Sequence, residues 1–266
     1  MAGANRDGRP PARYPPYMVE TVAGLGRFGI FAGRVVWRTV TPPWELAETA
    51  RHLWQVTSRC VLPVCATVFP LGMVMALQGL KIFDMFGAQQ LLSSLVGVAV
   101  FRELSPVLAS VLVAAQGGSS FAAELGAMRI KEELDATEVM AVDALRVHVV
   151  PRFLAALIAT PMLNLAGSAA GIAGGYLSAV WLEGEPGGVF LSNLWHLTSP
   201  IDLYGGTIKT LVFGAMVGLI SCYQGFYATG GAAGVGKAVN DTVVIAATGF
   251  IVANYFLTSA LFGAAG

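Results

Sequence analysis

The stretch that decides the fold is FRELSPVLASVLVAAQGGSSFAAELGAMRIKEELDATEVMAVDALRVHVVPR, residues 101–152. Its first twenty residues contain only two charged side chains, Arg102 and Glu103, whereas residues 124–150 carry nine. Another long apolar run, residues 153–181, follows directly. Two apolar runs that flank a short charged segment predict two membrane spans joined by a polar connection.

The overall composition points the same way. Apolar residues make up 55% of the 266 residues and charged residues only 12%. Soluble globular chains carry roughly a quarter charged residues, so this chain lacks the charge to cover a soluble surface. No basic cluster is interleaved with base-stacking aromatics, so no nucleic-acid partner is expected. Cys60, Cys65 and Cys222 lack a metal-ligand spacing and are interpreted as packing residues. The predicted class is an all-α integral membrane protein.

The number of spans follows from run lengths and charge. Residues 60–80, 153–181, 207–228 and 242–262 each have the length of one span. Residues 91–120 are too many for one perpendicular span of about 20 residues. The N-terminal arm and the region around Arg129 are both rich in Lys and Arg, so both should be cytoplasmic. An even number of crossings then separates them. We therefore predict one span here, with a bent approach up to about residue 101, and five spans in total.

This topology fixes the expected orientation and domains. Thirteen Lys and Arg fall on the inner side, and Lys81, Arg102 and Lys209 on or near the outer side. The N-terminus is expected in the cytoplasm and the C-terminus outside. We expect residues 1–16 to be disordered, residues 17–59 to form interfacial amphipathic helices, and residues 60–266 to form a five-span domain with an outer loop at about 182–206.

The N-terminal helix is predicted from its periodicity. Within residues 17–40, Arg27, Arg34 and Arg38 share one face, and Leu25, Val36 and Val40 lie opposite. This pattern is typical of a helix in the membrane interface with its arginines toward anionic headgroups. A soluble helix packed on the rest of the protein is the alternative.

The sequence contains no complete motif for nucleotide binding or catalysis. Residues 24–29 match a dinucleotide fingerprint, but no strand precedes them. Residues 231–237 resemble a phosphate-binding loop, but Ala238 replaces the Mg²⁺-binding Ser or Thr, and the loop joins two spans. His52, His148 and His196 are scattered and form no catalytic set. The chain is therefore not expected to be an enzyme, and a separate subunit would have to hydrolyse any ATP.

Two features are candidates for function. In the charged segment, Ile130, Leu134 and Ala141 can form an apolar strip among acidic neighbours, as in a helix that docks a soluble partner; a solvated loop is the alternative. Arg102-Glu103 either holds two helices together or holds a polar lipid headgroup, because charges at membrane depth need a partner or a cavity. Asn164 and Asn254 are interpreted as interhelical hydrogen-bond donors.

The quoted stretch closely resembles the MlaE/YrbE permeases of bacterial MCE-type lipid ABC transporters. So does CYQGFYATGGAAGVGKAVNDTVV, residues 222–244. The resemblance implies five spans after an interfacial helix, in the bacterial cytoplasmic membrane. It also implies a second permease copy, an ABC ATPase that binds ATP and Mg²⁺, an MCE-domain protein on the outer face, and lipid bound between the permeases. No cofactor is expected in this chain.

The resemblance also assigns site residues. It implies a coupling helix at about residues 132–142, within a helical segment at about 128–146. The residues predicted to contact the ATPase are Glu132, Glu133, Asp135, Glu138 and Met140. The residues predicted to contact lipid are Arg102, Glu103, Gln116 and Gln78.

This chain departs from the family pattern at three places. The family commonly has Gly-Arg where this chain has Ala115-Gln116, and often Thr-Arg where it has Asn240-Asp241. Ser105 replaces a usual Gly, which we interpret as a minor change. The two lost basic positions would alter the cargo or mark a heterodimer in which the partner supplies them.

We therefore predict the permease subunit of an ATP-driven transporter that moves phospholipids or related lipids to or from an MCE-domain protein. The alternative is a non-transporting membrane scaffold that recruits a soluble partner through residues 124–150. A membrane-embedded lipid enzyme is disfavoured by the missing catalytic set.

Overall fold

The computed structural model describes residues 16–42, 44–88 and 91–263. The disorder predicted for residues 1–16 thus falls almost entirely outside the described residues. Within these ranges the chain is helical and contains no strand. The helices are α1 (Pro16–Val40), α2 (Leu46–Phe86), α3 (Leu92–Ala99), α4 (Ser105–Val113), α5 (Ser119–Ile130), α6 (Glu133–Val139), α7 (Val150–Tyr176), α8 (Gly187–Leu197), α9 (Pro200–Phe226) and α10 (Gly231–Phe262). Four π-helical segments lie between them: η2 (Val100–Leu104), η3 (Ala114–Gly118), η4 (Leu145–Val149) and η5 (Leu177–Leu182).

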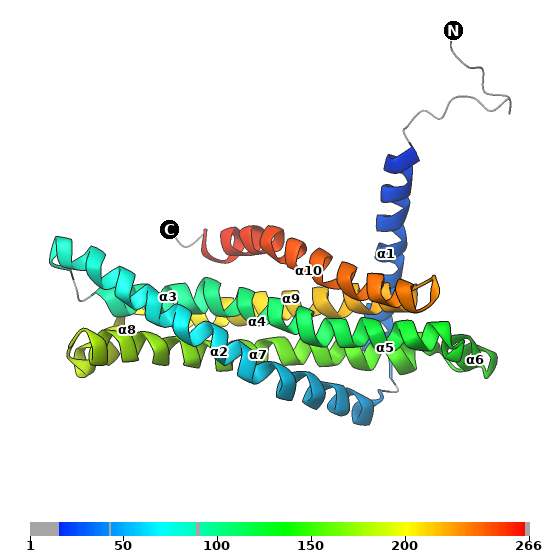
Figure 1. Ribbon diagram of the computed structural model, residues 1–266, viewed down its shortest axis with the longest axis horizontal. Coiled ribbons are helices and arrows are strands. Elements are labelled where there is room, and N and C mark those ends of the chain that lie inside the picture. The colour runs from blue at the N-terminus through cyan, green and yellow to red at the C-terminus, as the bar shows by residue number, and fades with distance from the viewer. Residues whose placement is uncertain (1–15, 43, 89–90, 264–266) are drawn as a thin grey trace, which may run out of the picture.

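Five helical stretches in the described ranges are long and apolar enough to cross a membrane, which confirms the predicted all-α membrane fold. They are Leu46–Phe86, Leu92–Ile130, Leu145–Leu182, Pro200–Phe226 and Gly231–Phe262. They lie side by side along the long axis of the molecule, and α1 crosses this axis at one end, beside α6 (Figure 1). We call this the α6 end; α8 lies at the opposite end, which we call the α8 end. The described ends of α1 and α10 lie toward opposite ends of the bundle.

The second crossing is one helical stretch, α3 to α5, interrupted by the π-helical turns η2 and η3. The predicted bend near residue 101 is instead the η2 turn, where the N–H of Ser105 donates to the carbonyl of Val100. Pro106 explains part of this geometry, because it has no N–H to donate to the carbonyl of Arg102 four residues earlier. The Nζ of Lys209 donates to that carbonyl instead, at 2.6 Å.

The core lies where α2 and α7 cross. The helices approach so closely at Gly72 that a Cβ added there would lie 2.0 Å from the carbonyl oxygen of Gly171. Small residues at such crossings let helices pack backbone to backbone in lipid, where dispersion contacts hold them together. Around this contact the buried side chains come from α2, α4, α7, α9 and α10, and include Val64, Leu163 and Phe213.

Helix α1 packs on the bundle through a face that the sequence pattern did not single out. Phe31 and Val35 are buried against α9 and η4, and the Phe31 and Tyr223 rings meet edge to face, with centroids 5.5 Å apart. The predicted apolar face stays exposed, with Leu25 67% and Val40 71% accessible. The helix therefore has one side on the bundle and an apolar side free to contact lipid.

Helix α10 is the most peripheral of the five spans. Only 11% of its most apolar stretch is buried, compared with 50% for α9. Its outer face carries exposed Ile251, Val252, Tyr255 and Phe256. Between α9 and α10 an open apolar hollow of about 780 Å³ is lined by residues that include Met216, Gly249 and Phe256. This face must contact lipid or another protein.

Candidate functional site

Arg102 and Glu103 lie on the η2 turn, and both contact side chains of α9 and α10. The guanidinium of Arg102 forms an ion pair with Asp202 on α9, with N···O distances of 2.6 and 2.7 Å. Asp202 also accepts a hydrogen bond from the N–H of Ser199 and so caps the start of α9. Arg102 therefore holds in place a side chain that caps the start of α9.

Glu103 accepts hydrogen bonds from three side chains. Lys209 on α9 donates at 3.0 Å, and Asn254 and Thr258 on α10 donate at 2.7 and 3.0 Å. The prediction that Asn254 donates between helices is confirmed. Gly206 makes the arrangement possible, because a Cβ there would lie 2.2 Å from the carbonyl oxygen of Phe101 and hold α9 away from η2.

The network is sealed on one side and open on the other. The side chains of Asp202 and Lys209 are 1% and 0% exposed, whereas those of Arg102 and Glu103 are 33% and 39% exposed. The guanidinium of Arg102 also stacks on the Phe262 ring, 4.2 Å from its centroid, in a cation–π contact. The buried pair holds the exposed pair in place, and the exposed pair is accessible to a polar ligand.

The other two predicted lipid residues lie elsewhere. Gln116 is on the η3 turn, thirteen positions or about 20 Å along the same helical stretch from Glu103. It is half-buried, with its Oε1 3.9 Å from the sulfur of Cys60. Gln78 is exposed on α2. The structure thus places Arg102 and Glu103 in one charge network but does not bring Gln116 or Gln78 into it.

A second buried ion pair lies at the α6 end. Arg152 on α7 is 4% exposed and pairs with Glu124 on α5 at 3.0 Å. Ser120 donates to the same carboxylate at 3.0 Å, and Arg152 also donates to the carbonyl of His148 at 2.6 Å. The pair joins the two spans that flank the charged segment.

The predicted ATPase-contacting residues gather at the tip of this end. Glu133, Asp135 and Glu138 lie on the two-turn helix α6, with Glu132 just before it and Met140 just after it. All five are exposed. Asp135 pairs with Arg129 and Glu133 lies 3.8 Å from Lys131, whereas Glu132 and Glu138 have no ion pair within the described residues. Exposed Val139 and Met140 give this acidic tip an apolar centre.

The backbone on either side of α6 is strained. Glu132 and Ala141 have φ of 60° and 61°, a conformation that costs energy for residues with a Cβ. Leu134 is 1% exposed and packs into the buried cluster that contains Phe31 and Val149, which leaves Ile130 and Ala141 of the predicted apolar strip exposed. The side chain of Leu134 therefore anchors α6 to the bundle, and a sharp turn lies on either side of this helix.

Two expectations need correction. Neither side-chain atom of Asn164 has a hydrogen-bond partner in the structure, so its predicted donor role is wrong. Its main-chain carbonyl instead accepts from the hydroxyl of Ser105 at 2.7 Å. The change from Gly to Ser at position 105 is therefore not minor, because the hydroxyl joins α4 to α7.

Sequence reasoning missed Asp202, Lys209, Thr258, Phe262 and the pairing of Glu124 with Arg152. The available signal was the energetic cost of charges in or beside apolar runs, which marks Lys209 and Asp202 as residues in need of partners. Nothing local in the sequence indicates that these partners are Glu103 and Arg102, about a hundred positions away.

Within the described ranges, no three His, Cys, Asp or Glu side chains lie close enough together to hold a metal ion. Five helical stretches long and apolar enough to span a membrane, with a partly exposed charge network on η2 and an exposed acidic helix at the α6 end, define a multi-pass membrane protein.

Comparison with known proteins gives the family. The sequence profile described as Permease MlaE matches residues 49–260, and the chain belongs to this family. It is 35% identical over 244 residues to a probable ABC transporter permease protein of Rickettsia felis, covering 92% of this chain and 94% of the relative. It is 34% identical over 250 residues to the intermembrane phospholipid transport system permease protein MlaE of Haemophilus influenzae, covering 93% and 95%. A chloroplastic protein of Arabidopsis thaliana, trigalactosyldiacylglycerol 1, is 32% identical over 237 residues, covering 89% and 68%.

Proposed function

We propose that this chain is the permease subunit of an ATP-driven ABC transporter that moves phospholipids or related lipids. The observation that carries the proposal is the full-length similarity to permeases of this class, including one named for intermembrane phospholipid transport. The arrangement of charges supports this function. The α6 end exposes an acidic helix to which a soluble partner could bind, and η2 carries a polar contact at membrane depth.

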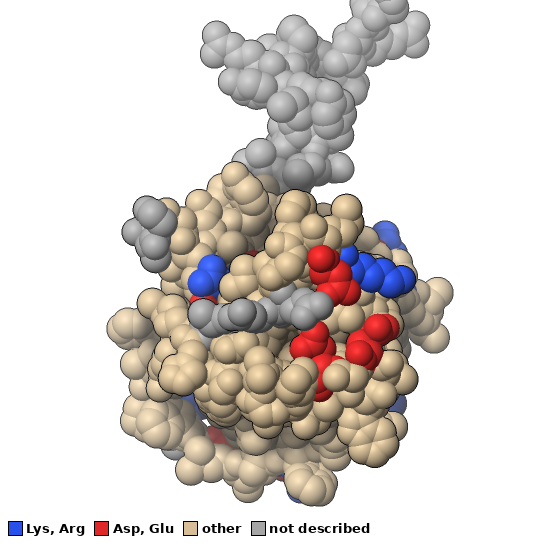
Figure 2. Space-filling view, turned by 90° about the vertical axis from the view of Figure 1, so that its left-hand side faces the viewer, with Lys and Arg blue, Asp and Glu red and all other residues tan. Residues whose placement is uncertain are grey.

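The orientation is part of the proposal. Lys131 and Arg146 lie near the α6 end with α1 and its arginines, so the positive-inside rule makes this end cytoplasmic. At the α8 end acidic side chains gather on one side of the face, and few basic ones are in view (Figure 2). This end would face outward from the bacterial cytoplasmic membrane.

The acidic tip would dock the ATPase, which would bind ATP and Mg²⁺. Val139 and Met140 would enter an apolar pocket of that partner, and Glu132 and Glu138, free of ion pairs in the described chain, would meet basic residues. A push on α6 reaches α5 and α7 together, because the Glu124–Arg152 pair ties these two spans directly behind the tip. Closure of the ATPase would thus move two spans as one unit.

Arg102 and Glu103 would hold the polar part of the lipid. The exposed part of the guanidinium can accept a phosphate while Asp202 holds its other side, and an arginine fork suits phosphate geometry. The ring of Phe262 would lie beside the first apolar atoms of the lipid. Gln116 and Gln78 would contact the lipid only if it extends along the bundle.

The remaining partners follow from exposed surfaces. The outer face of α10 would contact a second permease copy, with the lipid between the two permeases. The α8 end would be capped by an MCE-domain protein that receives or delivers the lipid.

One purification tests the proposal. The chain is expressed with its neighbouring transporter genes and purified by a tag on the permease, and ATPase activity and co-extracted lipid are measured in the same sample. The proposal requires both, and it requires Arg102→Ala to lose lipid while the complex stays assembled. Arg51→Ala, which removes an exposed arginine on α2 outside the network, is the matched control.

The other outcomes are distinct. An attached ATPase with no co-extracted lipid would indicate a scaffold that recruits a soluble partner. Lipid turnover without ATP would indicate an enzyme. Collapse of the complex in Arg102→Ala would assign the network a structural role only.

A further inference from the structure

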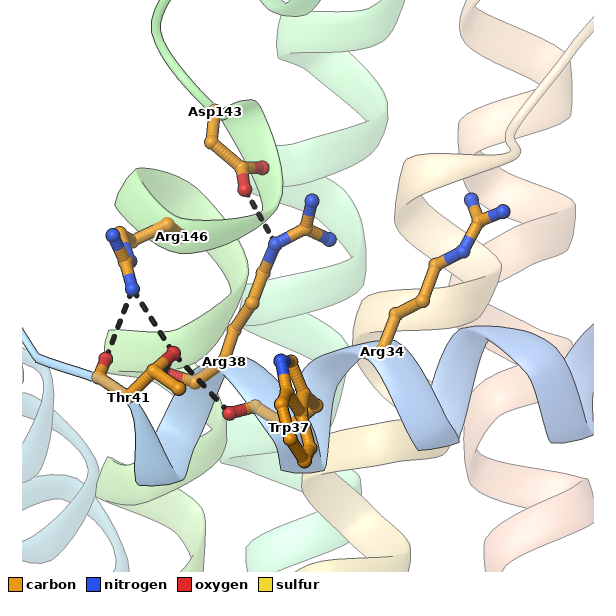
Figure 3. A pocket seen from close by; sticks show the side chains of 6 residues that line it. All are labelled: Arg34, Trp37, Arg38, Thr41, Asp143 and Arg146. Carbon is orange, nitrogen blue, oxygen red and sulfur yellow. Dashed lines mark hydrogen bonds and ion pairs between the residues drawn. The ribbon is translucent and has the colours of Figure 1, made fainter.

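A basic cavity of about 350 Å³ lies between the end of α1 and the start of the third crossing (Figure 3). Its lining residues are Arg34, Trp37, Arg38, Thr41, Asp143 and Arg146. The side chains of Arg34 and Arg38 leave α1 in the same direction, and Arg146 on η4 reaches over the end of that helix. Three guanidinium groups therefore share one cavity with a single carboxylate.

The hydrogen bonds of this cavity are incomplete. The Nε of Arg38 pairs with Asp143, but its Nη1 is buried without a partner. The Nη2 of Arg146 donates to the hydroxyl and the carbonyl of Thr41, both at 3.0 Å, but its Nε is also buried without a partner. Arg34 has no ion pair within the described residues. Unused buried donors of a cation are costly, and an anion in the cavity would offset the positive charge that three guanidinium groups bring together there.

The position of the cavity indicates how such an anion arrives. Helix α1 crosses the bundle axis and exposes apolar side chains, among them Trp37, which is 73% accessible and lies across the front of α1 between the two arginines. Tryptophan is enriched at the headgroup level of a bilayer. A second hollow of about 530 Å³ shares Arg34 and is lined by Phe31, Tyr223 and Tyr227. An anion with an apolar body would fill both spaces.

We propose that this cavity binds the phosphate of an anionic phospholipid from the leaflet in which α1 lies. The phosphate sits among Arg34, Arg38 and Arg146, and the glycerol and upper acyl chain lie against Trp37 and the aromatic hollow. The site lies where α1 crosses the bundle near the α6 end, whereas the proposed cargo contact lies on η2 between α3 and α4, so this lipid is a resident ligand rather than the cargo. It ties α1 to η4, which follows α6 directly.

The test uses the full-length complex in nanodiscs of either phosphatidylcholine alone or phosphatidylcholine with phosphatidylglycerol. Native mass spectrometry measures retained phosphatidylglycerol after delipidation. Arg34→Gln with Arg38→Gln removes two basic residues and is expected to weaken this retention roughly 30-fold. Arg51→Gln is the matched control, because Arg51 lies on α2, outside the cavity, and pairs only with Glu48.

A second variant keeps the proposal testable if the double variant fails to fold. Asp143→Asn removes the one carboxylate and keeps an oxygen to accept from the N–H of Leu145, so retention should rise. Unchanged retention in Asp143→Asn, or equal losses in the double variant and in Arg51→Gln, would overturn the site. Radiolabelled inorganic phosphate that binds in pure phosphatidylcholine and is lost in the double variant would overturn the lipid assignment in favour of a soluble phosphate.

Discussion

Arg102 and Glu103 are neighbours in the chain, yet their side chains belong to different contacts. One pairs with Asp202, and the other accepts from Lys209. The four charges cancel, as a low-dielectric environment requires. The sequence indicated that the first two were special, because they interrupt an apolar run. It could not indicate their partners, since the choice of partner depends on how α9 packs against η2.

This pairing predicts a stability difference. Glu103→Ala leaves the ammonium of Lys209, which is fully buried, with the carbonyl of Arg102 as its remaining hydrogen-bond acceptor. Removing one member of a fully buried pair costs about 3–5 kcal/mol; the cost here is smaller because Glu103 is partly exposed, but the uncompensated ammonium should still lower the melting temperature in detergent. Glu103→Gln combined with Lys209→Met removes both charges and should recover most of the loss. A double variant as unstable as the single one would contradict this account.

Among the structural elements, α6 is a short helix of two turns. Its exposed surface is acidic, with the apolar side chains of Val139 and Met140 at the centre. Its existence and exposure agree with the charged segment predicted from sequence, and its contact with an ATPase stays a prediction. The π-helical turns at Arg102 and Gln116 could not be predicted from the sequence. Where almost every residue is apolar, one extra residue in a helical turn does not change the pattern of apolar and polar positions. Pro106 was the only local hint.

The tip predicts a separation of docking from folding. Glu138→Lys reverses an exposed charge that makes no ion pair in the described chain, so the permease should insert and melt normally while ATPase co-purification falls at least several-fold. Asp135→Lys is a less clean change, because it also breaks the pair with Arg129. Glu183→Lys, an exposed reversal after η5 at the α8 end, is the control. Normal ATPase binding by Glu138→Lys would remove α6 from the interface.

The crossing of α2 and α7 predicts an asymmetric response to glycine replacement. Gly72→Ala puts a methyl group 2.0 Å from a carbonyl oxygen of α7 and must push the two helices apart. Gly236→Ala on α10 meets no atom within 4 Å and gains helix propensity, about 1 kcal/mol. Size-exclusion profiles in detergent should show loss of monodisperse protein for the first and none for the second.

For the whole molecule, an odd number of crossings puts the described ends of α1 and α10 toward opposite ends of the bundle. Run lengths and charge parity were enough to predict this count. The helices extend past these apolar runs, because α9 already starts at Pro200, where the N-cap Ser199 forms a capping box with Asp202, the partner of Arg102. Sequence patterns record length and polarity, whereas helix ends are set by contacts with other helices.

The proposed orientation has a direct reporter test. Alkaline phosphatase needs disulfides and is active only outside the cytoplasm. Fused after Gly266 it should be active, and fused after Met140 inactive, with the opposite pattern for a fluorescent protein that folds in the cytoplasm. Activity of both phosphatase fusions, or of neither, would contradict five crossings.

The two π-helical turns give the second crossing a tolerance of chain length that a regular α-helix lacks. Each holds one residue more than an α-helix needs, and each residue turns the helix by about 100° and advances it about 1.5 Å. Deleting Ala115 should therefore return η3 to a regular α-helix and keep Glu124 opposite Arg152, so folded protein should persist in the same size-exclusion assay. Ala115→Leu, at the same exposed position, should fold. In evolutionary drift this span should therefore accept the loss of one residue at these two turns more readily than in the regular helix on either side of them.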